Sequence, residues 1–337
     1  MINTIDYAST LNTDVKNNIV YIDTRSPGEF EKDHIPNSKN IAIFDDEERA
    51  IVGIIYARIS VDDAFDKGKE IYDKKITQIK EQLMEYKGSK LIIYCWRGGM
   101  RSKVITELAD EIGLDAIQLK GGYKSYRKYV RETLDSFKLK PKLVVLHGLT
   151  GSGKTDLLSL FSTMIDLEGL AQHRSSVYGS IGLKPKSQKA FESMLLAKLQ
   201  ELNDEEYILI EGESRKIGNV IMPEFLYKEM KKGINIRVNC SFESRARRLA
   251  KIYIGNKRDM QKTKDITKSL AKKIGKKTVN EMLKCLDENQ VTDFMKLILE
   301  KYYDPLYKYS IDKIDYSMSV DTDNMEEAKK QLEQKFF

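Results

Sequence analysis

The sequence predicts an α/β protein with two domains, each built around a parallel sheet, and with a helical C-terminal part. The chain has 337 residues, which is long for one hydrophobic core and comfortable for two. Short apolar runs predict buried parallel strands at residues 19–22, 91–95, 143–147 and 207–211. With 41% hydrophobic and 32% charged residues, the composition is that of a globular protein with a charged surface.

Residues 136–141, SFKLKP, are the predicted linker. The first domain is therefore expected at residues 1–135 and the second at residues 142–337. The formal net charge of +6 permits a nucleic-acid partner without requiring one. A monomer is expected.

Cysteine usage and hydropathy predict a cytoplasmic protein. Cys95, Cys240 and Cys285 lie far apart and are odd in number, so no disulfide framework or zinc spacing is present. The N-terminus has no basic segment followed by an apolar one, and no apolar run is long enough to span a membrane.

The first domain begins with the strand at residues 19–22 and a turn that contains Asp23 and Arg25. A short helix, the sequence His34-Ile-Pro and a second strand at residues 40–41 follow. Asp23 and Arg25 are expected to form a buried pair that organises the turn, and His34 is expected to tie the loop down rather than to catalyse. Residues 45–88 predict a charged helical insertion, either a surface feature or a contact with the second domain or the substrate.

The reactive feature of this domain is residues 91–102, LIIYCWRGGMRS. They predict a buried strand that ends at Cys95, a tight loop, and a helix from Ser102 that closes at Gly113. Backbone N–H groups of such a loop can bind an anion. With two nearby arginines, they should lower the thiol pKa below about 8.5 and steady a persulfide or selenide on the sulfur. The alternative is a small buried hydrophobe. The predicted selenium or anion loop is Trp96, Arg97, Gly98, Gly99, Met100 and Arg101.

The second domain begins with the strand at residues 143–147, followed by GLTGSGKT at residues 148–155. This matches the phosphate-binding pattern G-x-x-x-x-G-K-[ST], in which backbone N–H groups surround phosphate oxygens. An amphipathic helix is expected to follow, with apolar positions from Leu157 to Ile165. Lys154 adds a positive charge, and Thr155 could offer its hydroxyl to Mg²⁺. The predicted diphosphate-binding residues are Gly148, Gly151, Ser152, Gly153, Lys154 and Thr155.

Two carboxylates end the strand at residues 207–211. Glu211 and Glu213 stand where a magnesium-binding acid of a P-loop protein would lie. Either could hold Mg²⁺ through water or act as a general base; the alternative is an exposed turn. No metal ligand is certain. A third strand is expected at residues 234–238.

Residues 243–284 are rich in lysine and arginine and poor in acids. Such a run is often only a solvated helix face, but the excess of one sign favours an RNA phosphate backbone. Tyr253 could stack on a base. The predicted tRNA-binding residues are Arg245, Arg248, Lys251, Arg258, Lys272 and Lys273.

Several of these stretches resemble known families. The Asp23 turn, the His-Ile-Pro sequence, the Cys95 loop and Gly121-Gly122-Tyr123 together resemble a rhodanese domain. A rhodanese half before a P-loop half, with DLEGLA at residues 166–171 and YYDPLY at residues 302–307, resembles the tRNA 2-selenouridine synthase family. Residues 45–49 and 213–218 are similar to it as well, whereas Ser175 and Tyr178 depart from the glycine and phenylalanine expected there. Further candidate site residues in these stretches are Asp166, Glu168, His173, Arg174 and Arg215.

The resemblance implies a two-step reaction on 2-thiouridine at the wobble position of tRNA. Geranyl diphosphate alkylates the sulfur at the P-loop, and selenium from selenophosphate then displaces the alkylthio group. Cys95 is expected to carry the selenium as a selenosulfide. Selenophosphate synthetase could deliver the donor. No tightly bound cofactor is expected, although Mg²⁺ could take part.

Two other functions fit parts of the chain. One is a P-loop kinase or ATPase with a rhodanese sensor domain. The other is a general sulfurtransferase whose P-loop half only binds RNA. The sequence leaves open which tRNAs are used and whether one pocket or two serve the reaction.

Overall fold

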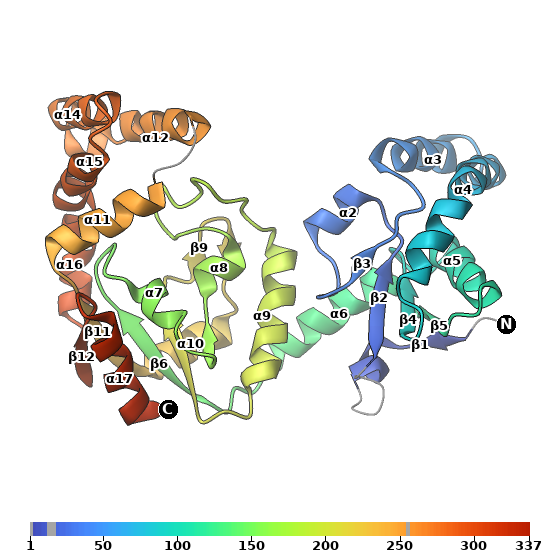
Figure 1. Ribbon diagram of the computed structural model, residues 1–337, viewed down its shortest axis with the longest axis horizontal. Coiled ribbons are helices and arrows are strands. Elements are labelled where there is room, and N and C mark those ends of the chain that lie inside the picture. Colours follow the sequence, from blue (N-terminus) through green and yellow to red (C-terminus); the bar gives the residue numbers. More distant parts are fainter. Residues whose placement is uncertain (1–2, 12–17, 254–256) are drawn as a thin grey trace. The chain divides into compact units, whose positions relative to one another are not determined.

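The computed structural model describes residues 3–11, 18–253 and 257–337. The chain divides into two compact units (Figure 1). Unit 1 contains Met1–Ser136 and Lys189–Ala197, and unit 2 contains Phe137–Gln188 and Lys198–Phe337. The return of Lys189–Ala197 to unit 1 has no counterpart in the expected domain boundaries.

Unit 1 is built on a five-stranded sheet in the order β1-β5-β4-β2-β3, with every neighbouring pair parallel. The predicted strands are confirmed. The strands are β1 (Thr4–Ile5), β2 (Ile19–Asp23), β3 (Lys39–Asn40), β4 (Lys90–Tyr94) and β5 (Ala116–Leu119). The helices are η1 (Tyr7–Leu11), α2 (Pro27–Lys32), α3 (Asp46–Arg58), α4 (Val61–Met84), α5 (Met100–Glu111) and α6 (Gly122–Asp135).

Alternation along β4 explains how the sheet of unit 1 is covered. Leu91 and Ile93 belong to a buried cluster with Ile105 and Leu108 of α5 and Ile79 of α4. Figure 1 shows α4 and α5 on one side of this sheet and α6 on the other. Because successive side chains of a strand point to opposite faces, a fully apolar strand is buried on both. The carboxyl end of β4 therefore opens between two helical layers, where Cys95 follows.

The charged insertion is helical, as predicted. Asp45 accepts the backbone N–H of Glu48 at 2.8 Å, while the Glu48 carboxylate accepts the N–H of Asp45 at 2.9 Å. This reciprocal capping fixes the start of α3. The Ser60 hydroxyl similarly accepts the N–H of Asp63 at the start of α4.

Unit 2 has a second five-stranded parallel sheet, in the order β12-β11-β6-β8-β7. Val144 and Leu146 of β6 pack in one buried cluster with residues of α7 and α17. The strands are β6 (Lys142–His147), β7 (Met164–Ile165), β8 (Tyr207–Glu211), β11 (Ile234–Asn239) and β12 (Met318–Asp321), with an antiparallel hairpin of β9 (Lys216–Ile217) and β10 (Val220–Ile221). The helices of unit 2 around this sheet are α7 (Lys154–Leu158), α8 (Leu167–Ala171), α10 (Glu224–Lys232) and α17 (Met325–Phe336), while α9 (Gln188–Leu202) has most of its residues in unit 1.

The prediction of a helix that continues from the P-loop to Ile165 is wrong beyond Leu158. Helix α7 ends there, and Met164 and Ile165 form strand β7, which pairs with Leu209 and Ile210 of β8. The apolar spacing fits a helix, but residues 159–163 include two serines and a threonine, which are weak helix formers. Pairing with a free edge of the sheet then decides the structure.

The helical C-terminal part packs around its own buried core, which includes Leu249, Met282, Phe294 and Leu299. Its elements are α11 (Phe242–Tyr253), α12 (Lys257–Ser269), α13 (Ala271–Ile274), α14 (Lys276–Asp287), α15 (Val291–Ile298), the π-helical turn η2 (Leu299–Tyr303) and α16 (Asp304–Asp312). None of the helices within the described ranges has the length and apolar character needed to cross a membrane.

Candidate functional site

Cys95 lies directly after β4 and is 4% exposed. Its Sγ accepts hydrogen bonds from the Gly99 backbone N–H at 3.2 Å and from the Ser102 hydroxyl at 3.3 Å. Helix α5 begins at Met100 rather than at the expected Ser102. The last two residues of the predicted loop therefore form the first helical turn, and the sulfur lies at the N-terminal end of α5, where backbone N–H groups favour an anion.

Two residues that sequence reasoning did not assign to the site support this thiol. Ser102 donates to the sulfur, and Gln118 donates to the Ser102 hydroxyl at 2.8 Å. The same amide also donates to the carbonyl oxygens of Gly98 and Gly99 at 3.1 Å. The sequence did hold one indication, because Gln118 is the only polar residue of the otherwise apolar strand β5.

The basic residues of the Cys95 loop differ in their surroundings. Arg97 is exposed. Arg101 is mostly buried, and its guanidinium forms an ion pair with Glu29 of α2 at 3.0 Å. The Trp96 ring packs against Tyr123, with ring centroids 5.2 Å apart. Arg97 is thus the loop cation whose charge remains available to an incoming anion.

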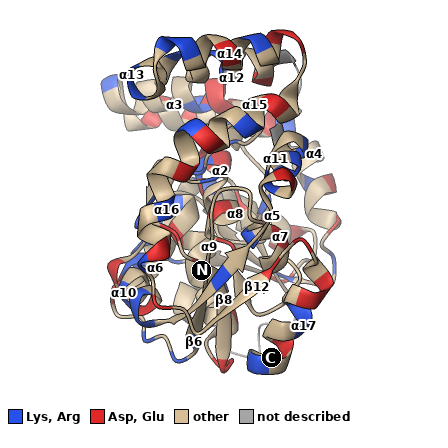
Figure 2. Cartoon of the chain, turned by 90° about the vertical axis from the view of Figure 1, so that its left-hand side faces the viewer, with Lys and Arg blue, Asp and Glu red and all other residues tan. Residues whose placement is uncertain are grey.

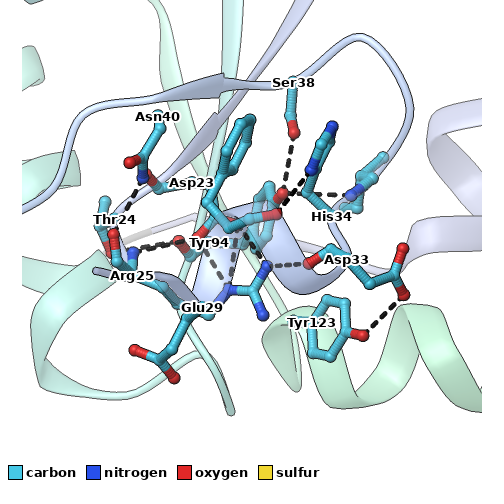
Figure 3. Close-up of polar contacts among 12 residues, drawn as sticks. Asp23, Thr24, Arg25, Glu29, Asp33, His34, Ser38, Asn40, Tyr94 and Tyr123 are labelled. Carbon is cyan, nitrogen blue, oxygen red and sulfur yellow. Dashed lines mark hydrogen bonds and ion pairs between the residues drawn. The ribbon is translucent and has the colours of Figure 1, made fainter. Parts of the chain in front are cut away.

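The Asp23 turn is the buried organiser that the sequence predicts (Figure 3). The Arg25 Nε–H donates to both Asp23 carboxylate oxygens at 3.0 Å, and its Nη2 donates to the Asp33 carbonyl at 2.7 Å. The guanidinium also lies 3.9 Å from the centre of the Tyr123 ring. His34 stacks on Phe30 and shares a hydrogen bond with the Phe30 carbonyl. These residues hold the scaffold around β4 and leave the chemistry to the Cys95 loop.

The start of α6 closes over the Cys95 loop. The N–H of Tyr123 donates to the Cys95 carbonyl at 2.8 Å. Gly122 has a φ of +56°, and a Cβ there would lie 2.3 Å from the Cys95 carbonyl oxygen. A side chain at this position therefore has no room, and glycine is required both for the backbone conformation and for the approach.

We predict that Gly122→Ala lowers the unfolding midpoint and weakens the Cys95 site. The matched control is Gly113→Ala, because Gly113 also has a positive φ, +80°, but has no atom within 4 Å of an added Cβ. Strain alone should cost about 1 kcal/mol in each variant, so the excess loss in Gly122→Ala measures the clash. Thermal unfolding followed by circular dichroism checks this, and equal midpoints would contradict it.

Unit 2 contains a cavity of about 500 Å³ at the P-loop. Its polar end is formed by the predicted diphosphate-binding residues from Gly148 to Thr155. Gly151 and Gly153 both have a φ of +79°, which glycine adopts without strain. Lys154 donates to the Gly148 carbonyl at 3.0 Å. The remaining wall is mixed: it holds charged and polar side chains together with the apolar residues Met230, Leu249, Ile252, Tyr307, Ile311 and Ile314.

Three carboxylates line the same cavity: Glu168, Glu211 and Glu213. Glu211 is 1% exposed, and its Oε1 accepts the Thr155 hydroxyl at 2.6 Å. Burial, and then the charges of Glu211 and Glu213, raise the pKa of Glu168 above its ordinary value. Burial also raises the pKa of Glu211, although Lys154 opposes the shift. Both carboxyl groups therefore stay protonated to higher pH than an ordinary glutamate does.

The residues present fit a magnesium ion. The Thr155 hydroxyl and Glu211 lie side by side, and the second carboxylate oxygen of Glu211 is buried without a hydrogen-bond partner. Hard oxygen donors of this kind suit Mg²⁺, with phosphate and water supplying the other ligands. No group of three or more His, Cys, Asp or Glu residues in the described ranges is arranged as a metal site by itself.

We predict that the affinity for inorganic diphosphate falls as pH rises in metal-free buffer. A carboxyl group with a raised pKa stays neutral to higher pH, and it repels a bound anion only once it ionises. Glu168→Gln should therefore bind more tightly at high pH and show a flatter pH profile. Isothermal titration from about pH 6 to 9 checks this. The control is Glu206→Gln on an exposed loop; an identical profile in Glu168→Gln and in the parent protein would refute the role of Glu168.

The other candidate residues are divided between the cavity and its scaffold. Arg174 lines the cavity. Asp166 caps α8 by accepting the Gly169 N–H at 2.7 Å and so positions Glu168. The His173 ring fills the space that a side chain at position 179 or 218 would need, so both positions are glycine. Burial lowers the pKa of His173. Arg215 donates to the Met222 carbonyl at 3.3 Å and is not among the residues that line the cavity.

The predicted basic face is also divided. Arg245 is 4% exposed, forms an ion pair with Asp304 and donates to the Thr150 carbonyl at 2.9 Å. Arg248 donates to the Gly151 carbonyl at 2.8 Å. These two arginines thus brace the P-loop from α11, whereas the sequence analysis predicts that they bind tRNA. The charge pattern does not indicate this structural role.

Other lysines of this region remain at the surface, as Figure 2 shows for the blue residues of α13. Lys251, Lys272 and Lys273 are exposed. Lys273 lies over the Tyr302 ring, with 5.5 Å between Nζ and the ring centre. The side chains of Arg258 and Tyr253 lie outside the described part of the structure.

A thiol loop on one parallel sheet and a P-loop on another define a two-domain enzyme of the rhodanese and P-loop type. Residues 8–129 match the model of the rhodanese-like domain, and residues 141–336 match that of the tRNA 2-selenouridine synthase AAA domain. The chain belongs to the tRNA 2-selenouridine synthase family.

Relatives match over most of the chain. The tRNA 2-selenouridine synthase of Shewanella piezotolerans is 31% identical over 87% of this chain and 88% of its own. That of Hydrogenovibrio crunogenus is 30% identical over 91% of this chain and 94% of its own. Among solved structures, the N-terminal domain of a putative ATP/GTP binding protein from Clostridium difficile 630 is 35% identical. It covers 38% of this chain and 98% of that chain, with a TM-score of 0.36.

Proposed function

We propose that this chain is a transferase that replaces sulfur by selenium in 2-thiouridine at the wobble position of tRNA, through an S-geranyl intermediate. The family supports the overall conversion. The observation that carries the finer proposal is the composition of the P-loop cavity of unit 2. The lining contains a phosphate-binding loop and also apolar side chains such as Leu249 and Ile252. The loop suits the diphosphate group of a prenyl diphosphate, and the apolar side chains suit its alkyl chain, for which a nucleotide has no counterpart.

In the first step, the C–O bond of geranyl diphosphate breaks and a bond forms between its C1 carbon and the thiouridine sulfur. Diphosphate leaves as an anion, which Lys154 and the P-loop N–H groups stabilise. Alkylation on sulfur also removes the proton from N3 of the base. A carboxylate of the cavity, Glu211 or Glu213, accepts that proton. Mg²⁺ held by Thr155 and Glu211 would add a further positive charge beside the leaving group.

In the second step, the alkylthio group is displaced by selenium from selenophosphate. This exchange is redox-neutral when selenium stays at the selenide level. The C2–S bond breaks, a C2–Se bond forms, geranylthiolate leaves and takes up a proton, and water cleaves the P–Se bond to give phosphate. A selenosulfide on Cys95 lies two electrons higher and needs an oxidant. We therefore assign Cys95 the role of a thiolate nucleophile: its Sγ forms a bond to C2 as geranylthiolate leaves, and selenium then forms the C2–Se bond as the C2–Sγ bond breaks and the Cys95 thiolate is released.

The RNA is held by phosphate contacts. Exposed lysines on α11 and α13, including Lys251 and Lys272, offer positive charge to a tRNA backbone. Selenophosphate synthetase could supply the selenium donor, and the proposal requires no tightly bound cofactor.

The test is a mass spectrum of nucleosides from 2-thiolated tRNA after incubation with the full chain and geranyl diphosphate, without selenium. The expected product is S-geranyl-2-thiouridine, which becomes 2-selenouridine when selenophosphate is added. No alkylated nucleoside, with tRNA binding intact, would reject the proposal. Rapid ATP turnover independent of tRNA would then favour a kinase or ATPase, and thiosulfate-dependent sulfur transfer a general sulfurtransferase.

A further inference from the structure

Unit 1 contains a second cavity, of about 430 Å³, in the helical insertion. Its walls come from α3, α4, the segment before α3 and the first turn of α5. Its volume falls in the range of about 300–1,000 Å³ that is usual for small-molecule sites. The apolar side chains that line it include Val52, Tyr56, Val61, Phe65, Met100 and Val104.

Several of these side chains are open to solvent. Tyr56 is 63% exposed, Val61 is 60% exposed, and Phe65 is 49% exposed. Isolated apolar residues are common on protein surfaces, but a contiguous apolar patch around a concavity marks a binding site. The charged residues of the lining are Lys69, Asp73 and Arg101. Since Arg101 is already paired with Glu29, the cavity suits an apolar occupant.

The cavity and the Cys95 loop share two residues, Met100 and Arg101. Gly99 and Ser102 both donate to the Cys95 sulfur, and the two residues between them, Met100 and Arg101, line the cavity. One helical turn therefore presents hydrogen-bond donors to the sulfur and apolar surface to the cavity. A substrate that reacts at Cys95 and carries an apolar tail therefore has, in the same helical turn, an apolar surface for the tail.

We propose that this cavity binds the alkyl chain of the S-alkylated thiouridine while C2 of the base faces Cys95. The inference rests on the proposed function, because it takes the S-geranyl base as the substrate of the Cys95 site. Two separate pockets then serve the two steps: the P-loop cavity holds the chain during alkylation, and the unit 1 cavity holds it during displacement. Unalkylated thiouridine lacks the tail, so the second site selects RNA that has completed the first step.

A photolabelling experiment tests binding without any turnover. An RNA stem–loop carries S-geranyl-2-thiouridine with a diazirine at the far end of the geranyl chain, and the full-length protein is irradiated with it. Labelled peptides that contain Phe65 or Met100 are the expected result. Labelling confined to peptides of the P-loop cavity, such as those with Ile252 or Tyr307, would overturn the proposal. Because alkylation is bypassed, this readout is independent of whether the protein performs it.

Variants then test the consequence for the reaction. Phe65→Glu and Val61→Glu place a charge in the wall at exposed positions, where folding should be preserved. The control, Ile54→Glu, changes a residue of α3 that is 54% exposed and is not part of the lining. With selenophosphate present, both cavity variants should raise KM for the S-geranyl RNA about tenfold and leave KM for an S-methyl RNA unchanged.

The outcomes separate the inference from the proposed function. If the parent protein never geranylates 2-thiouridine yet labels at Phe65, the cavity assignment stands and the proposed first step fails. Equal KM values of the parent protein for S-geranyl and S-methyl RNA would reject the cavity assignment alone. If labelling is absent and Phe65→Glu abolishes concentration-dependent self-association in sedimentation, the patch is an interface with a second copy, and the proposal is wrong.

Discussion

Cys95→Ala is expected to lose selenation almost completely while it retains geranylation. In the proposed mechanism the nucleophile is this thiol, whose sulfur accepts hydrogen bonds from the Gly99 N–H and the Ser102 hydroxyl. Removing a covalent nucleophile costs on the order of 10³-fold or more in rate. Nucleoside mass spectrometry of 2-thiolated tRNA, with and without selenophosphate, measures both steps in one reaction. The S-geranyl nucleoside should accumulate in the variant because its consumption is blocked.

Two further variants show whether the loss is chemical or structural. Cys285→Ala removes a half-buried thiol of α14 in unit 2 and should leave both steps unchanged. Ser102→Ala removes one donor to the sulfur and keeps the nucleophile, so it should slow selenation moderately. Loss of geranylation in Cys95→Ala as complete as the loss of selenation would show that the two steps are not divided between the two units.

Features that depend on local sequence could be predicted. The strands that carry Cys95 and the P-loop are short apolar runs that end in glycine-rich loops, so both the elements and their order follow from the pattern. The conformation of the Asp23 turn also follows, since a buried aspartate and arginine so close in sequence have little choice but to pair.

Features that depend on distant partners could not be predicted. Met164 and Ile165 satisfy a helical spacing and become a strand because β8 offers an edge more than forty residues later in the chain. Arg245 appears in the sequence as one of many cations, yet Asp304 makes it a buried brace of the P-loop. Gln118 supports the Cys95 loop because its amide donates to the carbonyl oxygens of Gly98 and Gly99. Each outcome is set by a contact between segments that sequence periodicity does not relate.

The unit 1 cavity illustrates the same limit. The insertion is recognisable from its sequence as charged and helical, but its apolar residues follow no clear amphipathic stripe in α3. Val52 and Tyr56 of α3 become parts of one wall only when α4 and the first turn of α5 pack beside them. The sequence therefore does not show that this insertion forms a cavity, which depends on the three-dimensional arrangement.

Lys154→Met is expected to lose geranylation and to keep selenation, which is the reverse of the result expected for Cys95→Ala. Geranylation should fall by about 10²–10³-fold, because the ammonium group neutralises charge that develops on the departing diphosphate. The loss should fall mainly on kcat, since the P-loop N–H groups still bind the ground-state diphosphate. Selenation of pre-geranylated RNA should proceed at the parent rate, as Lys154 belongs to unit 2 and takes no part at Cys95. Single-turnover assays with each RNA measure the two effects separately.

The matched control is Lys231→Met, which removes the same charge from the wall of the same cavity. The Lys231 ammonium lies 5.3 Å from the centre of the Tyr227 ring rather than on the P-loop, so its loss should cost less than tenfold. A Lys154→Met protein that geranylates normally but no longer hydrolyses ATP would identify the loop as a nucleotide site. Equal losses in the two variants would instead mean that the cavity attracts the anion by its overall charge, with no special role for the loop lysine in the departure of diphosphate.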